Sequence, residues 1–127
     1  MNDIVADASA IIALLMGEPF DRFDPATLNG ASISAVNLTE ILTRLKDLAI
    51  PDDRIDAAIA ELNLRVISFD EAQARAAARL RTATRQIGLS LGDRACLALG
   101  EKLKRPVVTA DRAWTNIDVG VEVILIR

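Results

Sequence analysis

The sequence predicts an α/β fold, a single domain with a mostly parallel central sheet and helices on both faces. Short apolar runs typical of buried strands alternate along the chain with segments whose apolar residues recur at the helical period. A length of 127 residues suits one compact domain. No repeat, low-complexity tract or linker interrupts the chain, so we expect one domain over residues 1–127.

Five short apolar runs are the expected strands. They cover residues 3–7, 31–34, 65–69, 106–109 and 121–126. The last is expected at an edge of the sheet. Because a helical segment separates most consecutive strands, parallel pairing with right-handed crossovers is expected.

The expected helices lie between these strands. They cover residues 9–16, a short helix beginning at Pro25, a helix after residue 34, a helix beginning at Pro51, residues 70–87 and residues 90–103. In the third helix the predicted buried stripe is Leu38, Ile41, Leu42, Leu45 and Leu48, and in the helix from Asp70 it is Ala72, Ala76, Leu80, Ala83 and Ile87. Asp70 and Ser90 are expected to cap their helices.

Composition excludes several classes of chemistry. The chain has no histidine, which removes Ser-His-Asp triads and His-ligated zinc. A single cysteine, Cys96, excludes internal disulfides and cysteine-cluster metal sites. No apolar run is long enough to span a bilayer, and the first residues have no basic region typical of a signal peptide. We therefore expect a soluble, cytoplasmic protein without a membrane partner.

A net charge of −3 is unfavourable for binding nucleic acid. If four acids were neutralised by metal, 15 basic residues would face 14 acidic ones. Twelve of the basic residues are arginine, which suits bidentate contacts to phosphate. The arginine content has an equally good explanation in the base composition of the genome.

Four acids occupy comparable places in the predicted fold. Asp7 and Asp111 each end an apolar strand, Glu40 lies early in a helix that follows a strand, and Asp93 lies where a helix begins. The carboxyl ends of parallel strands and the starts of the following helices meet at one edge of a sheet. Four carboxylates at one edge would repel unless a cation lay between them, and hard oxygen ligands suit Mg²⁺ or Mn²⁺.

Each of these acids also has a structural explanation. Asp7 could cap the helix that follows it, and Asp93 stands three residues after Ser90 in a pattern similar to a capping box. Glu40 lies off the apolar stripe and could simply be solvated, and Asp111 could be a turn acid. Their shared placement is the argument for a joint metal site.

Two hydroxyl residues lie beside these acids. Ser9 and Thr109 could orient a carboxylate or a metal-bound water, or could cap backbone groups. Without a histidine or cysteine nucleophile, the reacting group would be water activated by one or two metal ions, and phosphodiester hydrolysis is the reaction that fits.

Four blocks of the sequence resemble the PIN-domain family, and more closely the VapC toxins of type II toxin–antitoxin systems. They are Val5-Ala6-Asp7-Ala8-Ser9-Ala10, Ser34-Ala35-Val36-Asn37-Leu38-Thr39-Glu40, Gly88-Leu89-Ser90-Leu91-Gly92-Asp93-Arg94-Ala95-Cys96 and Thr109-Ala110-Asp111-Arg112-Ala113-Trp114. The resemblance covers essentially the whole chain in the same order, and the last two blocks are the most specific.

The resemblance implies an Mg²⁺- or Mn²⁺-dependent endoribonuclease. Its metal-binding and catalytic acids would be Asp7, Glu40, Asp93 and Asp111, supported by Ser9 and Thr109. It further implies a cognate VapB-like antitoxin that covers the active site, a homodimer, and an RNA substrate such as tRNA or rRNA. We also expect Arg94 and Arg112, each beside an acid, to contact RNA phosphate, although each could equally pair with a neighbouring acid.

Other classes fit less well. A phosphoacceptor receiver domain needs paired acids after its first strand, whereas Ala8 follows Asp7, and a haloacid-dehalogenase-like phosphatase needs a second aspartate where Ser9 stands. Two alternatives within the family stay open: a weakly active or inactive PIN binding module, and an RNA-processing PIN nuclease without an antitoxin. A small antitoxin gene immediately upstream would favour the toxin.

Overall fold

The protein is a three-layer α/β domain in a computed structural model that describes residues 3–127. Its elements in chain order are β1 (Val5–Ala6), α1 (Ala8–Leu15), η1 (Pro25–Leu28), β2 (Ser32–Ser34), α2 (Ala35–Asp47), α3 (Asp52–Glu61), β3 (Arg65–Ile67), α4 (Glu71–Thr84), α5 (Leu91–Leu103), β4 (Val107–Thr109), η2 (Arg112–Asn116) and β5 (Val123–Leu125). The expected strands and helices are all present, most of them one to three residues shorter than predicted.

All the pairings in the sheet are parallel, and the strand order is β3-β2-β1-β4-β5. The predicted parallel sheet is therefore confirmed, and β5 is an edge strand as expected. The order reverses at β1, because the chain first adds β2 and β3 on one side and then β4 and β5 on the other. The carboxyl ends of β1 and β4 lie at this switch point, where open α/β sheets bind ligands.

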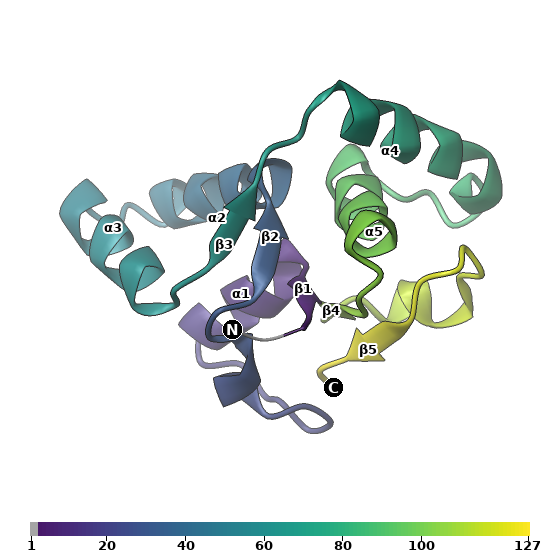
Figure 1. Ribbon diagram of the computed structural model, residues 1–127. Helices are drawn as coiled ribbons and strands as arrows, with labels where there is room; N and C mark the ends of the chain where they lie inside the picture. Colours follow the sequence, from purple (N-terminus) through teal and green to yellow (C-terminus); the bar gives the residue numbers. More distant parts are fainter. Residues whose placement is uncertain (1–2) are drawn as a thin grey trace.

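Helices lie on both sides of the sheet (Figure 1). Two apolar clusters fill the space between the helices and the two faces of the sheet. Neighbouring residues of a strand alternate between them, as the two-residue period of a strand requires. Val5 and Val107 belong to the cluster with α4 and α5, whereas Ala6 and Val108 belong to the cluster with α1 and α2. The core is built mainly of Ala, Val, Leu and Ile, as the low aromatic content predicts.

The predicted stripe of α4 is wrong at three positions. Ala72, Ala83 and Ile87 are exposed, and Ile87 lies beyond the end of the helix. The residues buried instead are Gln73, Ala76, Ala77, Leu80 and Thr84. The helix is rich in alanine, which is small enough for either face, so the sequence pattern does not fix which side packs against α5.

The stripe of α2 needs a smaller correction. Leu48 follows the helix and is 46% exposed, so it does not belong to the buried face. The buried residues are Asn37, Ile41 and Leu45, which are spaced four apart and therefore lie on one side of the helix. In residues 3–127, no helix is both long and apolar enough to cross a membrane.

Candidate active site

Asp7 lies at the carboxyl end of β1, where the strand order reverses. It is only 4% exposed, and it stands at the N-cap position of α1 without a side-chain capping hydrogen bond. The capping explanation for Asp7 is therefore excluded. Its carboxylate instead accepts hydrogen bonds from two hydroxyls, Ser9 Oγ at 2.6 Å and Thr109 Oγ1 at 2.9 Å, both to the same oxygen, Oδ2.

The two hydroxyls also connect Asp7 to the end of β4. Ser9 Oγ accepts a hydrogen bond from the backbone N–H of Ala110 at 2.9 Å. Thr109 Oγ1 accepts one from the backbone N–H of Asp111 at 3.1 Å. Each hydroxyl therefore accepts from the backbone and donates to Asp7 Oδ2, and the two hydroxyl oxygens lie 3.1 Å apart. These hydrogen bonds fix the position of the loop that carries Asp111 relative to Asp7.

The pKa of Asp7 is raised from 3.8 to about 6. Burial is the largest cause, because a charged carboxylate loses its hydration there. Asp93 and Glu40 raise it further, whereas the hydrogen bonds from Ser9 and Thr109 lower it. Both charged groups that act on Asp7 are acidic. The structure therefore brings Asp7, Glu40 and Asp93 close enough to interact, and no basic side chain in residues 3–127 is among the groups that act on the pKa of Asp7.

Glu40 belongs to the exposed surface of α2, but its carboxylate has a fixed partner. Asn37, one turn earlier on the same helix, donates from Nδ2 to Glu40 Oε1 at 2.8 Å. The same Nδ2 donates to the backbone oxygen of Gly92 at 2.9 Å. A Cβ placed on Gly92 would lie 2.2 Å from Glu40 Oε2. Glu40 therefore lies directly against the first turn of α5.

Asp93 forms the capping box that its spacing from Ser90 suggests. Ser90 Oγ accepts from the backbone N–H of Asp93 at 3.2 Å, and Asp93 Oδ2 accepts from the backbone N–H of Ser90 at 2.9 Å. Asp93 is nevertheless half-buried and lies near enough to raise the pKa of Asp7. The structural explanation for Asp93 is therefore correct, and it does not exclude a second role.

Asp111 is placed less closely with the other acids. It is exposed, and its Oδ1 accepts a hydrogen bond from the backbone N–H of Ala113 at 2.9 Å, which caps η2. It is not among the charged groups that act on the pKa of Asp7. The backbone N–H of Asp111 donates to Thr109 Oγ1, which connects its backbone to the site. The Asp111 carboxylate lies at the predicted end of β4, but it caps η2 and does not act on the pKa of Asp7.

Cys96 lies beneath the acids and is completely buried. Burial raises the pKa of its thiol well above the usual value, and Asp7, Asp93 and Glu40 raise it further. A thiol with a raised pKa stays protonated near neutral pH and is a poor nucleophile. Cys96 therefore contributes packing here, which agrees with the exclusion of cysteine chemistry from the sequence.

The donor set at this edge suits a hard divalent cation, although the side chains do not form a ready-made cage. Among residues 3–127, no three acidic or cysteine side chains are arranged to hold one ion together. Mg²⁺ typically keeps several waters and uses only one or two protein carboxylates. Buried Asp7, flanked by two acids and by no basic side chain that acts on it, fits that mode of binding.

The two arginines beside the acids differ from each other. Arg94 is half-buried, and its Nη1 donates to the backbone oxygen of Ala77 at 2.9 Å, so it joins α5 to α4. Arg112 is exposed at the start of η2. The bond to Ala77 accounts for the position of Arg94 without RNA, whereas Arg112 is free to reach a ligand at this edge. Contact with RNA stays a prediction for both.

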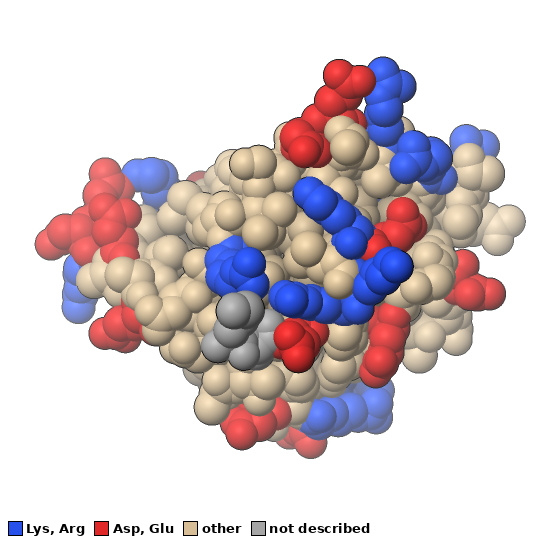
Figure 2. All heavy atoms as spheres, in the orientation of Figure 1, with Lys and Arg blue, Asp and Glu red and all other residues tan. Residues whose placement is uncertain are grey.

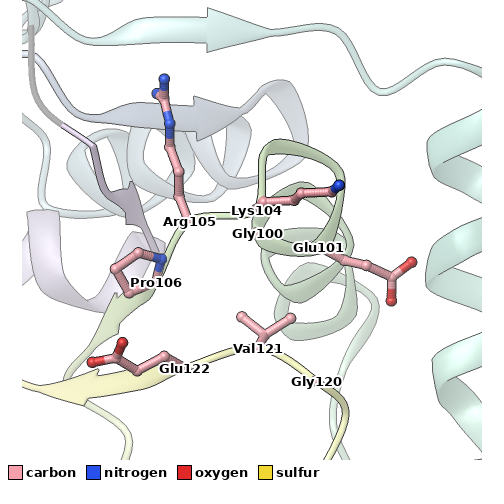
Figure 3. Close-up of a pocket in the computed structure, with 8 residues that line it drawn as sticks. All are labelled: Gly100, Glu101, Lys104, Arg105, Pro106, Gly120, Val121 and Glu122. Atoms are coloured by element: carbon pink, nitrogen blue, oxygen red, sulfur yellow. The ribbon is translucent and has the colours of Figure 1, made fainter.

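A separate cavity of about 410 Å³ lies at the amino ends of β4 and β5, opposite the ends of the strands that carry the acids. It is lined by Gly100, Glu101, Lys104, Arg105, Pro106, Gly120, Val121 and Glu122, just before β4 and β5 begin (Figure 3). The charged side chains around it extend in different directions in Figure 3, away from a common centre. Ligand sites have a few convergent polar groups, so the shape of this cavity does not indicate a binding site.

Basic and acidic side chains are mixed on the face of the molecule seen in Figure 2. Lys and Arg side chains lie near the middle of the view, over β3 and the end of α5, with Asp and Glu side chains among them. This face therefore has no patch of a single charge, and it does not by itself indicate a polyanionic partner.

Sequence reasoning did not single out Asn37 or Gly92. The available signal was a polar residue in line with Ile41 and Leu45 on α2, where an apolar side chain is expected. For Gly92 no local signal exists, because its contact with Glu40 depends on the packing of α2 against α5.

The fold and the acidic edge together define a parallel α/β domain with a carboxylate-rich site at its topological switch point. More specifically, the chain belongs to the PIN-domain family, since the family model "PIN domain" matches residues 4–120. The resemblance expected from the four sequence blocks is thereby confirmed. A comparison with curated proteins gave no match.

Solved structures share this fold over nearly the whole chain. A chain of DNA-bound VapBC from Salmonella typhimurium has a TM-score of 0.74 at 17% identity, covering 97% of each chain. A chain of VapBC-5 from Mycobacterium tuberculosis, a member of the VapBC toxin–antitoxin family, has a TM-score of 0.64 at 25% identity, covering 98% of this chain and 99% of that one. VapC20 from Mycobacterium tuberculosis, described as a sarcin-ricin-loop-cleaving toxin, has a TM-score of 0.64 at 17% identity, covering 94% of this chain and 98% of that one.

Proposed function

We propose that this protein is a VapC-like toxin, a metal-dependent endoribonuclease that is inhibited by a cognate VapB-like antitoxin. The observation that carries the proposal is the setting of Asp7. A buried carboxylate at the switch point of a PIN fold is flanked by Glu40 and Asp93 and receives no compensating positive charge from a side chain. Such a cluster is costly by itself and favourable around Mg²⁺ or Mn²⁺.

The acids Asp7, Glu40, Asp93 and Asp111 would hold the cation. Ser9 and Thr109 fix the orientation of the Asp7 carboxylate through Oδ2. The backbone N–H of Ser90 fixes Asp93. When bound, the ion would polarise the phosphate and offset the charge that develops as water is added across a P–O bond of the RNA. The chain supplies no histidine, and Cys96 stays protonated, so the chain's own contribution is orientation and negative charge.

An antitoxin partner is supported by the solved structures with this fold. Those from Salmonella typhimurium and Rickettsia felis are VapBC complexes bound to DNA, and FitAcB from Neisseria gonorrhoeae has the same fold. This chain exposes apolar side chains that a partner could cover, Met16 at 37% and Leu91 at 53%. Leu91 lies two residues before Asp93, so a partner docked there would stand beside the acids. A homodimer belongs to the same proposal.

Cleavage of RNA by the purified, antitoxin-free protein tests the nuclease directly. Total RNA, tRNA and rRNA would each be incubated with Mg²⁺, Mn²⁺ or EDTA, with wild type beside Asp93→Asn. Asp56→Asn, which removes an exposed acid from α3, is the matched control. We expect cleavage that needs metal, that is lost in Asp93→Asn and that is retained in Asp56→Asn.

Two other outcomes have a clear meaning. Cleavage that persists in EDTA and in Asp93→Asn would identify a contaminating nuclease. No cleavage of any RNA with either metal would contradict the enzyme and favour an inactive binding module. The observation that favours this alternative is that no three acidic or cysteine side chains in residues 3–127 are arranged to hold one ion together.

The partner requires its own test. Co-expression with the gene immediately upstream should give a complex that co-purifies and no longer cleaves RNA. If that gene product neither binds nor inhibits an otherwise active nuclease, the RNA-processing alternative is favoured instead.

A further inference from the structure

The buried face of α2 contains one polar residue at its amino-terminal end. Asn37, Ile41 and Leu45 are the buried residues of this helix, and Asn37 is completely buried. An apolar side chain would complete the stripe without a polar group to satisfy. A buried amide is unfavourable unless its hydrogen bonds compensate for lost hydration. The hydrogen bonds of Asn37 therefore indicate why an amide stands here.

Both acceptors of Asn37 belong to the acidic edge. Nδ2 donates to Glu40 Oε1 at 2.8 Å on its own helix and to the backbone oxygen of Gly92 at 2.9 Å on α5. Because both partners are acceptors, the amide must present its nitrogen to them. Its Oδ1 is buried without a hydrogen-bond partner in the described part of the chain. The orientation of the Asn37 side chain thus allows both hydrogen bonds of Nδ2 but leaves Oδ1 without one.

Gly92 supplies the space that this arrangement needs. A Cβ at residue 92 would lie 2.2 Å from Oε2 and 2.5 Å from Oε1 of Glu40. Such distances are too short for any real contact, so a side chain at residue 92 would displace the Glu40 carboxylate. Asn37 holds the carboxylate from one side, and the bare backbone of Gly92 lets it lie over the turn that carries Asp93.

We propose that Asn37 is a positioning residue that holds Glu40 in the metal site, with Gly92 kept bare so that the carboxylate fits against α5. The inference rests on the proposed function, because it treats Glu40 as a ligand of a divalent cation. Asn37 itself touches neither substrate nor metal. It fixes a long, otherwise exposed side chain, so that less freedom is lost when the ion binds.

The first experiment needs no metal. In a ¹⁵N-labelled protein, the side-chain amide signals of Asn37 are those that disappear in Asn37→Leu. We expect them to move when Glu40→Ala removes one acceptor, and to stay in place in Thr39→Ala. Thr39 is a matched control because its hydroxyl bonds only within α2, to the oxygen of Ala35 at 3.0 Å. Signals unchanged by Glu40→Ala would overturn the proposed contact.

The second experiment measures Mn²⁺ affinity by calorimetry in a double-mutant cycle. Loss of an outer-shell partner of a metal ligand typically costs about 10- to 100-fold in affinity. We expect Asn37→Leu to weaken binding within that range, and Asn37→Leu/Glu40→Ala to bind no more weakly than Glu40→Ala alone. Independent, multiplicative losses would show that Asn37 acts on the structure rather than through Glu40, and would overturn the proposal.

Gly92→Ala separates positioning from folding. The three atoms nearest to the new methyl group all belong to the far end of the flexible Glu40 side chain, and alanine is a better helix former than glycine. We expect the melting temperature to stay the same or rise while Mn²⁺ affinity falls. A variant that is unchanged in both respects would contradict the role of Gly92.

Failure of this inference is distinguishable from failure of the proposed function. If wild type binds no Mn²⁺ and cleaves no RNA, the nuclease is wrong, and the amide signals still decide whether Asn37 holds Glu40. If wild type binds Mn²⁺ and Asn37→Leu binds it equally well, the nuclease stands and the positioning role is wrong.

Discussion

Asp7 is a carboxylate in surroundings that disfavour its charged form. It is buried, the two charged groups that act on its pKa are acidic, and that pKa is raised to about 6. In the unfolded chain the same group has its ordinary value of 3.8. Between these two values the folded protein holds a proton that the unfolded chain has released. Without metal, the free energy of unfolding therefore falls as the pH rises through this window, and the penalty is complete above pH 6.

Asp7→Asn should remove this penalty. The difference of about two pKa units corresponds to roughly 3 kcal/mol. The amide oxygen of asparagine can still accept from Ser9 and Thr109. In EDTA at pH 7.5, we expect the variant to be about 1–3 kcal/mol more stable than wild type, with a flatter pH dependence. Urea unfolding at several pH values measures both, and a less stable variant at pH 7.5 would show that Asp7 serves the fold.

At the scale of elements, α5 combines two functions in one turn. The capping box stabilises its amino terminus, and the same Asp93 carboxylate belongs to the proposed metal site. The cap was recognisable from sequence because it depends on residues three apart. The register of α4 against α5 was not, because alanine-rich helices do not mark their buried face. The contact between Glu40 and Gly92 was not predictable from the sequence either, because it joins two helices that are distant in sequence.

The two roles of Asp93 can be separated by stability. Ser90→Ala removes the acceptor for the backbone N–H of Asp93 and should cost about 1 kcal/mol. Asp93→Asn keeps an oxygen that can accept from the N–H of Ser90, so it should cost less than that while RNA cleavage is lost. Urea unfolding and cleavage assays on both variants check this. A loss of several kcal/mol in Asp93→Asn would mean that its inactivity reflects unfolding.

At the scale of the whole molecule, the parallel sheet gathers residues that are distant in sequence. Because β1 and β4 are neighbours, Thr109 contacts both Asp7 and Ser9, which lie about a hundred residues earlier in the chain. Alternating strands and helices were sufficient to predict this architecture and the edge at which the acids meet. The sequence alone did not show that Asp111 points to a helix cap while the other three acids interact.

The positions of Arg112 and Arg94 predict different effects when each is replaced by alanine. Arg112 is exposed beside the acidic edge, so Arg112→Ala should weaken RNA binding and reduce the slope of log affinity against log salt by about 0.7, the value for one contact to single-stranded phosphate. Arg94→Ala should instead lower the melting temperature, because Arg94 joins α5 to α4. Binding measured from low to moderate salt tests this, and an unchanged slope in Arg112→Ala would refute its contact with phosphate.

In the proposed site, acids from distant parts of the chain share one divalent cation. A calorimetric titration of wild type with Mn²⁺, beside Asp7→Asn, Glu40→Gln, Asp93→Asn and the control Asp56→Asn, tests it most directly. We predict saturable binding in wild type and the control, and weaker binding in each of the three site variants. Equal affinity in all five proteins, or no binding in wild type, would contradict a shared metal site.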